Sequence, residues 1–154
     1  MPDYAKLIEY FDVCICHYAE LLDFENEKLR LIASENIIEL QNKIPKEQAL
    51  IMKGNALEAK RIEIMKKEGL DGKRFEQLIE NAPDEFKTAL IRSRDSLSKY
   101  INEIRRINSN AMQTVSTRLS RLEKLRSNLS TDTYDGKGEK KHSVSSSSSL
   151  SKNV

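Results

Sequence analysis

The sequence has no tryptophan, three prolines and five glycines, and aromatic residues make up only 6% of it. A sheet protein with many turns needs more of these residues, so the composition argues against a fold built from strands. Charged residues instead make up 32% of the chain. With 154 residues and an apolar fraction of 38%, we expect one all-α domain with a narrow core, followed by a tail.

Cysteines, targeting signals and long apolar runs are also scarce. Cys14 and Cys16 are the two cysteines, too few for a disulfide scaffold. The N-terminus, MPDYAKLIEYFDV, is acidic and lacks the basic leader of a signal peptide. No apolar run approaches the ~20 residues of a membrane span. We therefore expect a cytoplasmic protein without stable membrane insertion.

Acidic and basic residues are concentrated in different parts of the chain. Residues 1–45 hold nine acidic and four basic residues, whereas residues 82–130 hold five acidic and ten basic residues. Packed antiparallel, these segments would attract one another. The bases of 82–130 are spread around their predicted helix among Asp95, Glu103 and Glu123, rather than on one stripe. We therefore expect intramolecular pairing and no nucleic-acid binding.

A long stretch over residues 84–129 contains neither proline nor glycine. Its apolar residues recur at steps of three, four and seven, which places them on one face of a helix about 70 Å long. They are Phe86, Leu90, Leu97, Ile101, Ile104, Ala111, Val115, Leu122, Leu125 and Leu129. A helix of that length, apolar to its end, needs a partner helix from this chain or another.

A first long helix is predicted over residues 3–43. Asp3 is placed to cap it, and Pro45 lies just beyond its end. Glu25 and Asn36 occupy two places in its apolar seam, where polar residues cost stability and often set the register.

A second helix is predicted over residues 46–68, weakened by Gly54 by about 1 kcal/mol relative to alanine. A short connecting helix over residues 73–81 is expected to pack through its apolar residues, Phe75, Leu78 and Ile79. Together the elements predict an elongated antiparallel bundle of three main helices plus one short connecting helix, over residues 1–130. The serine-rich residues 131–154 are expected to form a disordered tail.

Two short motifs contain residues of chemical interest. In Cys14-Ile15-Cys16-His17, the two thiols point about 200° apart on a helix, so they cannot close one tetrahedral metal site. We expect a small buried filler and an exposed thiol instead. The segment Gly69-Leu-Asp-Gly72-Lys73 lacks the spacing of a phosphate loop and follows no strand. We therefore expect no metal, no cofactor and no enzymatic activity.

The predicted helices carry more apolar surface than they can cover among themselves. The helices over 3–43 and 84–129 are much longer than the helix over 46–68. A strip on the distal part of 84–129 should therefore lack an internal partner. Such strips mark partner sites, and an amphipathic helix fits them. The alternative is a self-associating coiled-coil structural or adaptor protein, in which dimerisation closes the seam.

Three segments of the chain are similar to motifs of a known family. They are Ile101-Asn-Glu-Ile-Arg-Arg-Ile-Asn108-Ser-Asn110-Ala-Met, Thr133-Tyr134-Asp135-Gly136-Lys137-Gly138 and Glu25-Asn-Glu-Lys-Leu29. In that order they resemble the Asn-containing turn, the tail motif of Tyr followed by Gly, and the mid-helix acidic patch of the FlgN-type flagellar export chaperones. The layout of a long acidic helix, a shorter helix, a Gly-marked connection and a long last helix is also similar.

The resemblance implies a cytoplasmic type III export chaperone. Family members bind the C-terminal helices of hook-associated (hook–filament junction) proteins of the FlgK and FlgL type, prevent premature assembly and deliver this cargo to the export gate. The predicted cargo-binding residues are Ile101, Ile104, Ile107, Met112, Val115, Leu119, Leu122, Leu125 and Leu129. The family pattern suggests that Tyr134 docks to the export gate, the alternative being that it folds back onto the bundle. A weak homodimer is a further expected use of the seam.

Overall fold

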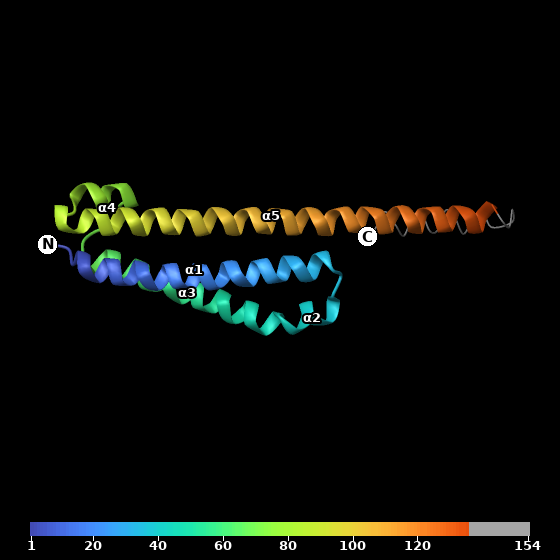
Figure 1. Ribbon diagram of the computed structural model, residues 1–154, viewed down its shortest axis with the longest axis horizontal. Helices are drawn as coiled ribbons and strands as arrows, with labels where there is room; N and C mark the ends of the chain where they lie inside the picture. The colour runs from blue at the N-terminus through green and yellow to red at the C-terminus, as the bar shows by residue number, and fades with distance from the viewer. Residues whose placement is uncertain (136–154) are drawn as a thin grey trace. The chain divides into compact units, whose positions relative to one another are not determined.

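The computed structural model describes residues 1–135, and the side chains of residues 1–130 (Figure 1). Within this range the chain is all helical, which confirms the predicted fold class. The helices are α1 (Tyr4–Ala33), α2 (Ile37–Asn42), α3 (Ile44–Lys67), α4 (Phe75–Asn81) and α5 (Asp84–Asp135).

The chain divides into two compact units, Met1–Ala111 and Met112–Val154. The first unit contains α1 to α4 and the first part of α5, and the described part of the second is the rest of α5. α5 continues six residues beyond the predicted end at residue 129. The predicted disordered tail, 131–154, lies outside the described residues from position 136 onward, and the domain boundary at residue 130 stays a prediction.

Asp3 begins α1, as its position in the sequence predicts. Its Oδ1 accepts a hydrogen bond from the Lys6 N–H at 3.0 Å, and its own N–H donates to Glu68 Oε2 at 2.9 Å. The first bond satisfies one of the four backbone donors that every helix start leaves free. The core of the first unit follows from the spacing of apolar residues in α1. Its main cluster contains Tyr4, Leu7, Tyr10, Phe11, Cys14, Ile64, Met65, Leu70, Leu78, Ala82 and Leu90.

The prediction of one unbroken helix over residues 3–43 is wrong, because the chain turns at residues 34–36. Glu35 lies in the left-handed region with φ 58°, which ends α1. The Asn36 side chain then accepts a hydrogen bond from the Glu39 N–H at 3.2 Å and caps α2. Asn36 therefore starts a helix rather than occupying a seam. No residue of α2 is buried.

α3 returns alongside α1 in the opposite direction (Figure 1). It starts at Ile44, two residues earlier than predicted, and Pro45 lies in its first turn, where a missing N–H costs nothing. A Cβ atom added to Gly54 would lie 3.2 Å from His17 Nε2. Gly54 thus makes room for the His17 ring of α1, which explains a glycine that weakens its own helix.

The predicted connecting helix is confirmed as α4. Gly69 and Gly72, with φ 69° and 73°, make the turns that lead from α3 to it. The Phe75 ring lies 4.6 Å from the Phe11 ring, centroid to centroid, and Leu78 is buried in the core. α4 therefore closes the core of the first unit beside α1.

The expectation that residues 1–45 and 82–130 pack antiparallel is wrong. Tyr4 and Phe86, each in the first turn of its helix, stack with ring centroids 5.9 Å apart, so α1 and the first part of α5 run in the same direction (Figure 1). In a bundle whose successive helices are antiparallel, the first and third must be parallel. The ion pairs Lys28–Glu47, at 2.9 Å, and Lys53–Glu20, at 3.3 Å, join α1 to α3.

Candidate functional site

The apolar stripe of α5 is covered up to Ala111. Leu90 is 0% exposed, Ile107 is 1% exposed, and Ile104 and Ala111 are also buried. This corrects the expectation that the open seam starts at Ile101, since Ile104 and Ile107 are core residues and Ile101 is half-buried. None of these three predicted cargo-binding residues has a fully exposed side chain in the free chain.

Beyond Ala111 the apolar residues of α5 are exposed. Their exposed fractions range from 43% for Val115 to 75% for Met112. Steps of three and four separate them, so at about 100° per residue they lie on one side of the helix. We call this set the distal apolar face: Met112, Val115, Leu119, Leu122, Leu125 and Leu129. All six are among the residues that the sequence predicts to bind cargo.

Basic residues accompany the distal apolar face. Residues 112–130 hold four basic residues and one acid, Glu123. By the period of the helix, Arg126 falls inside the apolar stripe, between the directions of Leu119 and Leu122, and Arg121 falls on its flank. The sequence prediction assigned these bases to pairing within the chain and did not single out Arg126, although its position follows from the spacing of the apolar residues around it.

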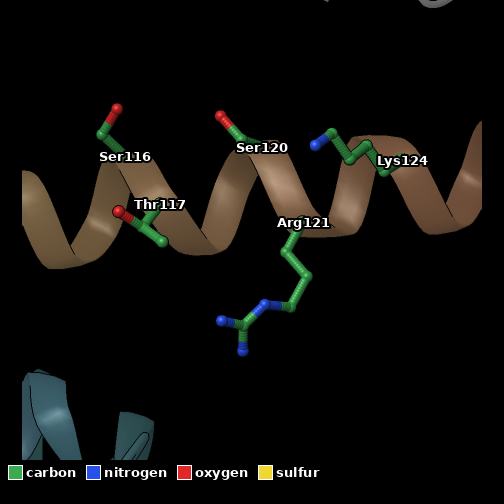
Figure 2. Close-up of a pocket in the computed structure, with 5 residues that line it drawn as sticks. All are labelled: Ser116, Thr117, Ser120, Arg121 and Lys124. Atoms are coloured by element: carbon green, nitrogen blue, oxygen red, sulfur yellow. The ribbon is translucent and has the colours of Figure 1, made fainter.

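The opposite side of the same stretch carries hydroxyl groups. A shallow hollow there is lined by Ser116, Thr117, Ser120, Arg121 and Lys124. Figure 2 shows the hydroxyls of Ser116 and Ser120 and the amine of Lys124 on one side of α5, with the Arg121 guanidinium extending to the other side. All five residues come from one helix and none is an acid, so the hollow supplies neither an enclosing wall nor an acid–base pair.

The motif Cys14-Ile15-Cys16-His17 behaves as a packing element. Cys14 is buried and Cys16 is exposed, as the sequence predicts. Burial raises the pKa of the Cys14 thiol, which disfavours the reactive thiolate. Across the described residues, no cluster of three or more His, Cys, Asp or Glu side chains could hold a metal ion.

The acidic patch of α1 contributes to the pairing of α1 with α3. Glu25 is buried, and its Oε2 lies 3.2 Å from Lys28 Nζ, which also lies 2.9 Å from Glu47 Oε2. Desolvation opposes the charge on Lys28, but its hydrogen bond to Glu47 and the nearby charge of Glu25 outweigh that effect and raise its pKa. Lys43 and Glu27 form a second pair at 2.7 Å. These carboxylates are therefore ion-pair partners.

The family comparison spans nearly the whole chain. The model of the FlgN protein family matches residues 1–142. The chain belongs to the FlgN family. FlgN proteins are flagellar export chaperones rather than enzymes, and they bind flagellar export substrates. No curated protein and no solved structure gave a match.

Two further observations bear on this FlgN chain. Tyr134, the residue predicted to dock to the export gate, belongs to α5, but its side chain lies outside the part that the structure describes. No helix among the described residues is long and apolar enough to cross a membrane.

Proposed function

We propose that this chain is a cytoplasmic chaperone that binds the C-terminal helices of hook–filament junction proteins of the FlgK and FlgL type on its distal apolar face. The observation that carries the proposal is the exposure of six large apolar side chains on one side of α5, from Met112 to Leu129. A groove or stripe of this spacing suits an amphipathic helix, which presents its own apolar residues at the same period.

The energy of such binding is supplied by covering apolar surface. Full burial of a leucine contributes about 1.5–3 kcal/mol, so covering these half-exposed side chains contributes on the order of 1 kcal/mol each. Part of that gain offsets the entropy lost when two molecules associate. Met112, unbranched and flexible, suits a surface that accepts more than one related helix.

Prevention of premature assembly follows from the same contact. A terminal helix held on α5 has its apolar stripe covered, so the stripe is not available for subunit contacts until release. Delivery to the export gate through Tyr134 belongs to this proposal and rests on the family pattern alone.

The proposal predicts that the double change Leu122→Asp/Leu125→Asp abolishes co-purification with a junction protein. Two carboxylates at the centre of the face would lose their hydration on docking without gaining a partner. Both side chains are exposed, at 60% and 52%, so helicity by circular dichroism should stay close to that of the parent chain. Pull-down with a tagged junction protein measures the binding.

The matched control is Ile37→Asp/Ile38→Asp, which changes two exposed isoleucines of α2, outside the face. This control should bind cargo as the parent does. Unchanged cargo binding by the folded Leu122/Leu125 variant would overturn the proposal.

Self-association is the second candidate function, because the same exposed face could pair with its copy in another molecule. Sedimentation at micromolar concentration separates the two. A tight dimer that resists cargo favours a structural coiled coil, whereas a monomer, or a weak dimer that cargo dissociates, favours the chaperone.

A further inference from the structure

Arg126 occupies an unusual place on the distal apolar face. Counting about 100° per residue from Leu122, Arg126 lies about 40° around the helix, and Leu119 about 60°. A helix that covers Leu119, Leu122 and Leu129 therefore also covers Arg126. Its methylene stem can pack on apolar groups, but its guanidinium carries a positive charge.

No described residue neutralises Arg126 within the chain. Glu123 stands one turn earlier, yet the ion pairs of the described residues include neither Arg126 nor Arg121. Both arginines are exposed. A docked helix without a complementary charge would desolvate an unpaired guanidinium, which is costly.

The net charge of residues 112–130 is positive, like the charge of Arg126. Arg121 lies about 100° from Leu122 on the flank of the face, and residues 112–130 carry four bases against one acid. A flank charge contributes less than a covered charge because water still screens it. It still favours partners of opposite charge and disfavours partners of like charge.

We infer that the helix bound by this face is acidic at its margins, with one carboxylate placed opposite Arg126 and further carboxylates along the Arg121 flank. The inference rests on the proposed function and names the charge pattern of the partner. Arginine binds a carboxylate through two parallel N–H groups, so an acid at the right turn would fix the register of the docked helix as well as its affinity. Apolar contacts at repeated leucine spacing do not fix the register alone, since a shift by one heptad restores them.

Three synthetic peptides of about 20 residues test the inference. They share leucines at heptad a and d places and differ only at the flanking places, which hold Glu, Gln or Lys. Fluorescence anisotropy with the full chain at low salt should rank their affinities Glu above Gln above Lys, with about tenfold or more between the extremes. The difference should shrink as salt is raised, because screening weakens flank charges.

Variants of the chain locate the effect. Arg126→Glu should weaken binding of the Glu peptide about tenfold or more, and Arg121→Glu about two- to fivefold. The matched control is Lys124→Glu, which makes the same change of charge in the same stretch. Lys124 lies on the hydroxyl side of α5 (Figure 2), so its replacement should change affinity less than twofold. Arg126→Leu completes the apolar stripe, and should bind the Gln peptide more tightly while discriminating less between Glu and Lys peptides.

The outcomes separate the inference from the function on which it rests. Equal affinity for the Glu and Lys peptides, with the Gln peptide also bound, would overturn the charge inference and leave helix binding intact. An effect of Lys124→Glu as large as that of Arg126→Glu would also overturn it, since net charge alone would then explain the preference. If none of the three peptides binds, both the inference and the proposed helix-binding function of the face are contradicted.

Discussion

At the scale of single residues, His17 is a buried polar group of the first unit. It is 3% exposed, and its Nδ1 has no hydrogen-bond partner in the part of the chain that the structure describes. Burial lowers its pKa, the charge of Lys53 lowers it further, and Glu20 opposes that effect. Gly54 leaves the ring just enough space on α3. Protonation would therefore place an unpaired charge between α1 and α3.

His17 should make the chain sensitive to mild acid. Its pKa in the folded chain lies below the ordinary value of 6.5 that applies in the unfolded chain, so between these two values the unfolded chain binds more protons. The free energy of unfolding should therefore fall as the pH drops from about 7.5 to 5.5. Urea unfolding at several pH values measures this dependence.

The variant His17→Gln should lose most of that dependence, whatever its own stability, because glutamine does not titrate. His142→Gln removes the only other histidine and serves as the matched control, which should keep the slope of the parent chain. An identical slope in His17→Gln and the parent would show that His17 is not the sensitive group.

At the scale of helices, the ends of each element are decided by local side-chain chemistry. The cap of α1 and the glycine stop after α3 follow from residues visible in the sequence. The turn at 34–36 also has a local signal, since Asn36 with Glu39 three places later is a helix-start pattern. The longer apolar periodicity of residues 3–43 masked that signal in the sequence prediction.

Asp3→Ala should destabilise the first unit by about 1 kcal/mol, because the Lys6 N–H at the start of α1 loses its acceptor. α1 carries much of the core, so fraying there affects the whole first unit. Chemical denaturation measures the loss as a lower midpoint with an unchanged slope.

Asp12→Ala is the control for Asp3→Ala, since Asp12 is exposed in the middle of α1. It removes the same charge and should change stability by no more than about 0.5 kcal/mol. Equal losses in both variants would point to net charge rather than to the cap.

At the scale of the whole molecule, stability and binding are assigned to different parts of the chain. Among residues 1–130, whose side chains the structure describes, the buried ones belong to Met1–Ala111, whereas the distal apolar face belongs to the second unit. The core should therefore be complete without the residues that we propose to bind cargo.

A chain shortened to residues 1–118 should unfold cooperatively at nearly the same temperature as the full chain. It retains about two turns beyond Ala111, which protects the last buried residues from fraying. It lacks Leu119, Leu122, Leu125 and Leu129, and should no longer bind junction-protein helices. Calorimetry and pull-down check the two results, and a large loss of thermal stability would show that the second unit supports the core.

The sequence by itself determined that the chain is helical, that α4 packs through Phe75 and Leu78, and that the last helix carries more apolar surface than its neighbours cover. These properties are local, because they depend on periods of three and four residues and on caps. The tertiary structure decided that α1 and the first part of α5 run parallel. It also decided that the apolar stripe of α5 is buried as far as Ala111, rather than only to about Ile101. Both depend on where other helices begin and end, since a side chain is buried only if a neighbouring element extends alongside it. The spacing of apolar residues within one helix does not show how far its neighbours extend.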